Sequence, residues 1–187
     1  MSKPLVVVTG ASSGIGEAIA RQMSEQGHPL LLLARRLERL QALDLPKTLC
    51  KKVDVTDRKA VAEAVAEAEA LYGPADCIVN NAGLMQLGFV HEQDPDQWDN
   101  MIDVNIKGVM SGIRAVLPGM KERQQGTIIN ISSVAGRKTF ANHAVYCGTK
   151  FAVHGLSETL REEVASDNIR VVTLARCGRN RTSRTHH

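Results

Sequence analysis

Short apolar runs alternate with longer amphipathic stretches along almost the whole chain, and this alternation limits the possible folds more than any other feature. The runs have the length of buried strands, and they cover residues 5–9, 29–34, 48–55, 75–81, 126–132 and 169–174. The stretches between them have helical apolar spacing, and they cover residues 14–26, 35–43, 57–72, 95–122 and 143–166. Helices rather than hairpin turns separate the runs, which favours parallel strands joined by right-handed crossovers. The sequence therefore predicts an α/β fold with one doubly wound parallel sheet.

The predicted helix at residues 57–72 shows how a core face is read from spacing. The residues expected to form its buried stripe recur at helical intervals, and they are Val61, Val65, Ala68 and Leu71. Either Thr56 or Asp57 can accept a hydrogen bond from the amides of the first turn, so one of them is the expected N-cap.

Composition excludes several classes of function. The 187 residues suffice for one domain with a sizeable core, which we assign to residues 1–175. Net charge is only +3 and aromatic residues make up 3%, so the basic, aromatic face typical of nucleic-acid binding is missing from the sequence. Four widely spaced cysteines without a CxxC pair argue against disulfides or zinc and favour a cytoplasmic location. The apolar run near the N-terminus is too short for a signal peptide or a membrane span.

A glycine-rich segment, VVVTGASSGIG, joins the first predicted strand to the first predicted helix and contains Gly10, Gly14 and Gly16. Glycine lets the backbone turn tightly and approach a pyrophosphate, while the helix N-terminus offers free N–H groups and the positive end of its dipole. The spacing is GxxxGxG rather than the commoner GxGxxG, and a segment of this kind can also be a simple turn. Its position directly after the first strand favours a nucleotide site.

The end of the second predicted strand indicates which dinucleotide is bound. A carboxylate in this region usually holds the ribose 2′-hydroxyl of NAD. Here Ala34 is followed by Arg35 and Arg36, whose guanidinium groups suit the additional 2′-phosphate of NADP. Both arginines can also be solvated residues at the start of a helix. We favour NADP(H), with Arg35 as the more important contact.

Tyr146 and Lys150 are four residues apart in a predicted helix, so they share one helix face. A nearby ammonium group favours the phenolate form of tyrosine, which makes the pair suitable for acid–base catalysis. Such a pair is also common on solvated helix faces. However, Ser132 and Ser133 end the fifth predicted strand, and ligands bind at the carboxyl ends of strands in open α/β sheets.

Together these motifs resemble the short-chain dehydrogenase/reductase family. They are TGASSGIG, the DV at residues 54–55, NNAG at 80–83, VNIKG at 104–108, NISS at 130–133 and YCGTK at 146–150. All occur in the order and on the predicted elements that the family shows, and the similarity extends from Leu5 to about Leu174. The resemblance implies a Rossmann-like, three-layer fold, and the ARR at residues 34–36 resembles the members that prefer NADP.

The same resemblance implies catalytic roles for four residues. Tyr146 is the expected proton donor or acceptor, and Lys150 favours its phenolate and binds the nicotinamide ribose. Ser133 is expected to orient the substrate carbonyl, whereas Ser132 reads as a strand-end cap. Asn105 is expected to hold a water that links Lys150 to solvent, although it can also be a residue at a break in the predicted helix.

Cofactor and subunit contacts also follow from the resemblance. The implied NADP(H)-binding residues are Gly10, Ser12, Ser13, Gly14, Ile15, Gly16, Arg35, Arg36, Asp54, Val55, Asn81, Ala82, Gly83, Tyr146 and Lys150. The expected substrate is a small alcohol or carbonyl compound, since similar members act on hydroxy acids, including serine, and on small aldehydes. Members usually pair through helices equivalent to residues 95–122 and 143–166, which implies a homodimer or a homotetramer. No metal, nucleic-acid or membrane partner is expected.

The sequence after Ala175 departs from the family, where a Pro-Gly turn and a V-x-T segment are expected. A codon choice exists for residues 175–186 that, read one base later, translates as PGAVETELLAH. We therefore interpret residues 176–187 as an aberrant tail from a shifted reading frame, a hypothesis that DNA sequencing tests. If the chain ends as written, the sheet stops after its sixth strand and the alternative function is a truncated, inactive nucleotide-binding or interaction protein.

Overall fold

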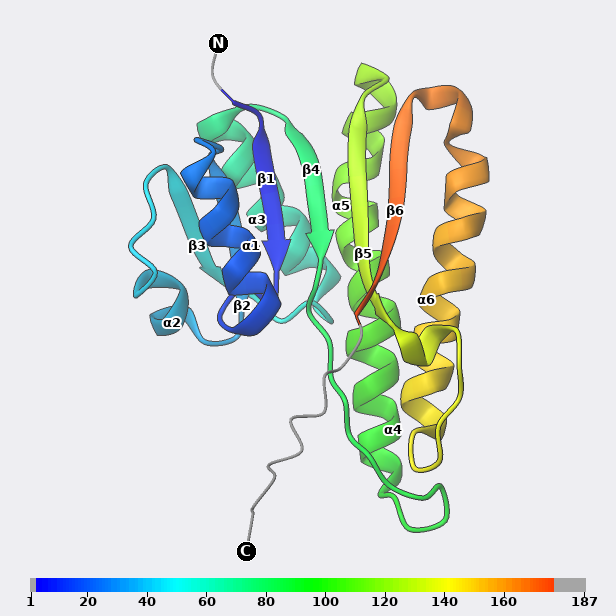
Figure 1. Ribbon diagram of the computed structural model, residues 1–187. Coiled ribbons are helices and arrows are strands. Elements are labelled where there is room, and N and C mark those ends of the chain that lie inside the picture. The colour runs from blue at the N-terminus through cyan, green and yellow to red at the C-terminus, as the bar shows by residue number, and fades with distance from the viewer. Residues whose placement is uncertain (1–2, 177–187) are drawn as a thin grey trace, which may run out of the picture.

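A computed structural model describes residues 3–176 and confirms the predicted parallel sheet (Figure 1). Six strands lie in the order β3-β2-β1-β4-β5-β6, and every neighbouring pair is parallel. Their bounds are β1 Leu5–Thr9, β2 Leu30–Ala34, β3 Thr48–Lys52, β4 Ala75–Asn80, β5 Gly126–Ser133 and β6 Ile169–Arg176. Because the strand order reverses between β1 and β4, the carboxyl ends of these two strands flank the crevice where such folds bind ligands.

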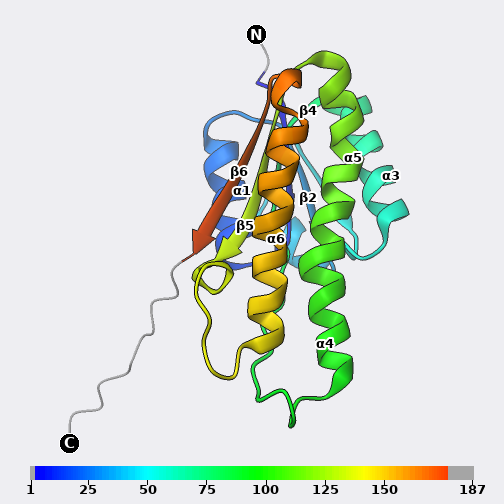
Figure 2. The ribbon, with the colours of Figure 1, turned by 90° about the vertical axis from the view of Figure 1, so that its right-hand side faces the viewer.

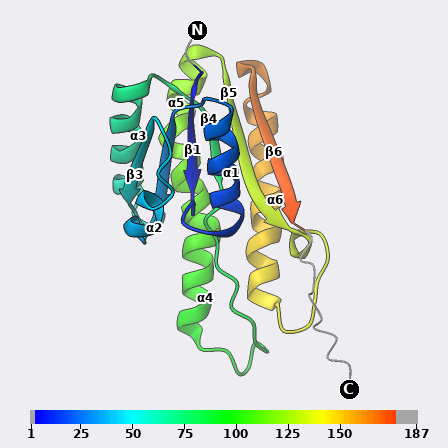
Figure 3. The same ribbon diagram turned by 60° about the vertical axis from the view of Figure 1, so that its left-hand side comes forward.

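Helices cover both faces of the sheet and produce the three expected layers. Their bounds are α1 Gly14–Glu25, α2 Leu37–Gln41, α3 Arg58–Tyr72, α4 Pro95–Ile102, α5 Gly108–Arg123 and α6 Ala144–Glu163. Figure 2 shows α3, α5 and α6 side by side on one face, and Figure 3 shows α1 across the opposite face. Alternate strand residues supply the two cores, since Val7 packs with the α3, α5 and α6 layer while Val8 packs with α1. Between residues 3 and 176, no helix has the length and apolar character that a membrane crossing needs.

The interruption expected near Asn105 is a change of helix type rather than a break in the helix. A π-helical turn, η1 Asp103–Lys107, connects α4 to α5, and the Gly108 amide bonds to the carbonyl oxygen of Asp103. A π turn inside an α-helix inserts one extra residue and is frequent at functional sites. Asn105 lies within this turn and is fully buried.

Helix α3 settles one sequence alternative and corrects another prediction. Asp57, not Thr56, is the N-cap, because its carboxylate accepts a hydrogen bond from the Ala60 amide at 3.0 Å. Val61, Val65 and Ala68 are buried as predicted, but Leu71 is 60% exposed. Tyr72, the next residue of the last turn, packs against the core in its place, so the fourth position of the predicted stripe was wrong.

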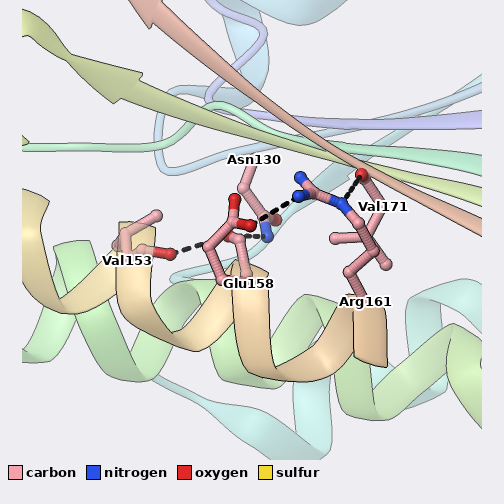
Figure 4. A network of polar contacts seen from close by, with 6 residues as sticks. Asn130, Val153, Glu158, Arg161 and Val171 are labelled. Atoms are coloured by element: carbon pink, nitrogen blue, oxygen red, sulfur yellow. Dashed lines mark hydrogen bonds and ion pairs between the residues drawn. The ribbon is translucent and has the colours of Figure 1, made fainter. Parts of the chain in front are cut away.

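A buried polar chain connects the sheet to α6. The Asn80 side chain donates to Asn130 Oδ1, and Asn130 Nδ2 donates to Ser157 Oγ, both at 2.9 Å. Ser157 in turn donates to the carbonyl oxygen of Val153, one helical turn earlier. Figure 4 shows this side of α6, where Arg161 also bonds to the carbonyl oxygen of Val171 in β6. Asn80 Oδ1 is buried without a hydrogen-bond partner, but the bonds of Ser157 and Arg161 are paired, and these two join α6 to β5 and β6.

Candidate active site

One cleft of about 940 Å³ lies at the carboxyl ends of the strands, across the point where the strand order reverses. The sequence-predicted residues that line it are Gly10, Ser12, Ser13, Gly14, Ile15, Arg35, Arg36, Asp54, Val55, Asn81, Ala82, Gly83, Tyr146 and Lys150. Gly16, Asn105 and Ser133 lie outside this lining. Segments from distant parts of the sequence therefore meet at one edge of the sheet, as Figure 1 shows from the common direction of the strands.

The glycine loop is packed so tightly that side chains are excluded at two of its positions. Gly10 has a φ of +64°, and a Cβ added there would lie 2.7 Å from the Cα of Ala82. A Cβ at Gly16 would lie 2.4 Å from the Gly10 carbonyl oxygen. Gly16 therefore permits close packing of α1 behind the loop, and the structure places it behind the cleft rather than in its wall.

Thr9 fastens the glycine loop to the segment after β4, and sequence reasoning missed it. Its buried hydroxyl accepts hydrogen bonds from the amides of Asn81 and Ala82, at 3.0 and 3.1 Å. Asn81 Nδ2 donates back to the carbonyl oxygens of Thr9 and Gly10, both at 3.1 Å. The signal was present in the sequence as a threonine directly before the loop, but its partner lies about 70 residues away.

The arginine pair lies beside the start of α1. Arg36 Nη2 donates to Ser12 Oγ at 3.3 Å and to Ser13 Oγ at 3.4 Å, which brings its guanidinium group against the glycine loop. Arg35 is exposed and also lines the cleft. This end of the cleft thus contains two cations, two hydroxyl groups and a helix N-terminus, an arrangement that attracts anions.

Tyr146 and Lys150 line the opposite part of the cleft from one face of α6, as their spacing predicted. Lys150 is only 7% exposed, and its Nζ lies 5.8 Å from the centroid of the Tyr146 ring. The ammonium group donates to the carbonyl oxygen of Ile131 at 3.1 Å. Burial disfavours the charged form and lowers the pKa of Lys150 to about 8.

This pKa makes stability depend on pH in a defined window. Below pH 8 the folded protein carries a buried charge at Lys150. Between pH 8 and 10.5 the folded state has lost this proton while the unfolded state still binds it, so stability rises with pH. The shift from 10.5 to about 8 corresponds to roughly 3 kcal/mol. We expect Lys150→Met to abolish this rise, as measured by urea unfolding across the window.

The comparison between the parent and Lys150→Met isolates the lysine from other titrating groups. Burial, with a smaller contribution from Asp76, raises the pKa of the Cys77 thiol to about 11, which gives the opposite slope because the unfolded thiol ionises first. This slope is common to both proteins and cancels in their difference. Parallel stability curves for the two proteins between pH 8 and 10.5 would contradict the assignment.

The two serines that end β5, Ser132 and Ser133, have the opposite roles in capping from those expected. Ser132 lines the cleft, and its hydroxyl donates to the Lys150 carbonyl oxygen at 3.5 Å. Ser133 is the residue that caps, because its Oγ accepts from the Ala135 amide at the start of the short helix η2 Val134–Gly136. The prediction that Ser132 caps the end of the strand was therefore wrong, because Ser133 makes the capping hydrogen bond.

Asn105 uses its side chain to hold the loop after β4. Its Oδ1 accepts from the Leu84 amide at 2.7 Å, and its Nδ2 donates to the Leu84 carbonyl oxygen at 2.8 Å and to Thr149 Oγ1 at 3.0 Å. The expected water contact cannot involve a free side-chain N–H, since both are used. The sequence alternative placed Asn105 at an interruption of the predicted helix, and its position in the π turn η1 agrees with that.

Sequence reasoning also missed much of the apolar lining. The residues concerned are Leu33, Ala34, Val53, Leu84, Met85, Val104 and Ile131. They lie near the carboxyl ends of strands, in the segment after β4 or in η1, and nothing in their residue type separates them from ordinary core residues. Within the described range of residues 3–176, no three His, Cys, Asp or Glu side chains are grouped closely enough to hold a metal ion.

Comparison with known proteins agrees with the geometry. The sequence model of the family described as short chain dehydrogenase matches residues 4–186. An uncharacterized oxidoreductase of Staphylococcus saprophyticus is 46% identical over 177 residues, which cover 91% of this chain and 72% of that protein.

Two solved structures have similar folds. Serine dehydrogenase from Escherichia coli superposes with a TM-score of 0.88 at 40% identity, over 91% of this chain and 81% of that one. A metagenomic short-chain oxidoreductase in complex with NADP gives a TM-score of 0.88 at 35% identity, over 95% and 84% of the two chains.

Proposed function

This chain belongs to the short chain dehydrogenase family, and we propose that it is an NADP-dependent oxidoreductase that interconverts a small alcohol and a carbonyl compound. One observation carries the proposal. The Tyr146–Lys150 pair on α6 lines the same cleft as the glycine loop, so an acid–base pair and an anion-binding loop border one space. A hydride-transfer enzyme needs both of these next to each other.

The cleft residues fit a phosphorylated dinucleotide. Gly10 lets the loop backbone lie close to a pyrophosphate, and the N-terminus of α1 supplies amides directed at it. Ser12, Arg35 and Arg36 would hold the 2′-phosphate of NADP. Asp54 and Val55 would border the adenine, and the segment from Asn81 to Gly83 would line the groove. The related metagenomic enzyme, whose structure contains NADP, supports this choice.

The remaining steps belong to residues of this chain. Tyr146 would donate a proton to the substrate oxygen during reduction or accept it during oxidation. Lys150 would favour the tyrosinate through its charge and bind the nicotinamide ribose. Ser133 would orient the substrate carbonyl, which requires its hydroxyl to donate to substrate while it accepts from Ala135. The bound dinucleotide supplies or accepts the hydride.

The direct test measures NADPH oxidation with a panel of aldehydes and ketones, and NADP⁺ reduction with alcohols and hydroxy acids. Serine and 3-hydroxy acids belong in the panel because a similar fold is found in serine dehydrogenase. We expect turnover of at least one compound and faster rates with NADPH than with NADH. NADPH binding without turnover of any compound would instead support the alternative of an inactive nucleotide-binding protein.

We also propose that the chain forms a homodimer or a homotetramer through α5 and α6. Met110 on α5 and Phe151 on α6 are 50% and 42% exposed, which is high for large apolar side chains on adjacent helices. Light scattering coupled to size exclusion measures the assembly, and a monomer at micromolar concentration would contradict the proposal.

The free Cys50, Cys77 and Cys147 fit the expected cytoplasmic location, which cell fractionation tests.

A further inference from the structure

Thr149 is a buried hydroxyl that the proposed chemistry does not use. It lies in α6 between Tyr146 and Lys150 and is 2% exposed. Its Oγ1 donates to the carbonyl oxygen of Tyr146 at 2.8 Å and accepts from Asn105 Nδ2 at 3.0 Å. One proton and one acceptor site are thus both used, so the orientation of the hydroxyl is determined by its two neighbours.

The contact with Asn105 extends this connection to the far wall of the cleft. Asn105 forms two hydrogen bonds with the backbone of Leu84, one to its N–H and one to its C=O. Leu84 and Tyr146 both line the cleft, so the chain of bonds begins and ends in its wall. A Cβ built at the adjacent Gly83 would lie 3.4 Å from Asn105 Oδ1 and 3.6 Å from Lys150 Nζ, which shows how closely these groups pack.

We propose that Thr149 is a positioning residue that sets the first turn of α6, with Tyr146, against the π turn and the Leu84 loop. The inference rests on the proposed function only for its effect on turnover. Without the hydroxyl, Asn105 Nδ2 loses one of its acceptors inside a buried site, and the Tyr146 carbonyl loses its second hydrogen bond. Small displacements of a reacting group reduce rates strongly, since catalysis depends on alignment.

Ser157 provides a matched control on the same helix. It too is fully buried, donates to a backbone carbonyl oxygen one turn earlier, and accepts a hydrogen bond from an asparagine side chain. Its asparagine, however, is Asn130 in strand β5, which does not line the cleft, rather than Asn105, which bonds to the cleft residue Leu84. Thr149→Val and Ser157→Ala therefore each remove one donated and one accepted hydrogen bond. The first pair of bonds involves Tyr146 itself, and the second lies further along α6.

The experiment compares Thr149→Val, Thr149→Ser and Ser157→Ala in the full chain. Hydrogen exchange of the Leu84 amide, measured by NMR relative to the Val7 amide at the sheet centre, should accelerate roughly tenfold in Thr149→Val only. Turnover should fall about tenfold or more in Thr149→Val with the KM for NADPH within about twofold, and Thr149→Ser should restore most of it. Ser157→Ala should lower the unfolding midpoint without this selective effect on Leu84.

Unchanged relative exchange at Leu84 in Thr149→Val would overturn the proposal, as would equal defects in Thr149→Val and Thr149→Ser. A selective loss of protection at Leu84, reversed by serine, supports it even if no compound of the panel is turned over. Tyr146→Phe, assayed in parallel, separates the two proposals: parental turnover in that variant would refute the proposed function while the exchange result still decides the role of Thr149.

Discussion

Replacing Tyr146 by phenylalanine is expected to lower turnover by roughly 10²- to 10⁴-fold, the range typical for loss of a general acid–base group. The substitution removes only the hydroxyl, so the ring keeps its place in the cleft and next to Lys150. NADPH binding, followed by fluorescence titration, should stay within about threefold because the phosphates are bound at the other end of the cleft. A loss of turnover without a loss of binding is the signature of a group that acts on the substrate.

The chain offers a matched control for this variant. It contains two tyrosines, and the other, Tyr72, ends α3 away from the cleft lining. Tyr72→Phe should retain the parental rate with every substrate of the panel. If Tyr146→Phe also retained it, the proton would have to come from another group, and the proposed mechanism would be wrong.

Removing the arginine pair should have the second largest effect, this time on cofactor choice. Arg35→Ala combined with Arg36→Ala should weaken NADPH binding by roughly 10- to 100-fold, since charge-assisted hydrogen bonds contribute about 1.5–3 kcal/mol each and exposure reduces this value. NADH lacks the 2′-phosphate, so its affinity should change by about threefold or less. Parallel titrations of the variant with the two cofactors measure the ratio.

The single variants distinguish the two arginines, and Arg39 serves as their control. Both arginines are exposed, and Arg36 is preoriented by its bonds to Ser12 and Ser13. Arg39 is exposed on α2 but does not line the cleft, so Arg39→Ala should leave both affinities near the parental values. Equal weakening of NADPH and NADH in the double variant would show that the pair does not read the 2′-phosphate.

The bounds of the strands and of the helices were both predicted to within three residues. Leu5–Thr9 agrees at both ends, and the other strands agree within a few residues. Strands of a parallel sheet are buried on both faces and so appear as continuous apolar runs, which the sequence shows directly. Leu71 was assigned to the buried stripe of α3, but Tyr72 packs on the core instead, because positions three and four residues after Ala68 both suit the stripe and spacing alone does not choose between them.

The cleft was predicted from the same pattern, because parallel strands bring their carboxyl ends to one edge of the sheet. Details that depend on contacts between distant segments were not predictable. The bonds of Thr9 with Asn81 and of Asn105 with Leu84 and Thr149 depend on strand order and on the π turn. The same reason explains the serine pair, where backbone geometry after β5 decides that Ser133 rather than Ser132 caps η2.

By itself, the sequence determined the α/β class, the parallel sheet, the glycine loop, the arginine pair and the spacing of Tyr146 and Lys150, since these follow from local periodicity and residue chemistry. Residues 177–187, with most of the predicted aberrant tail, lie outside the described residues. Only the tertiary structure decided that Gly16 serves packing, that Lys150 is buried against the Ile131 carbonyl oxygen, and that Thr149 connects Tyr146 to Asn105. These features depend on which distant groups share a buried space, and burial is a property of the assembled fold.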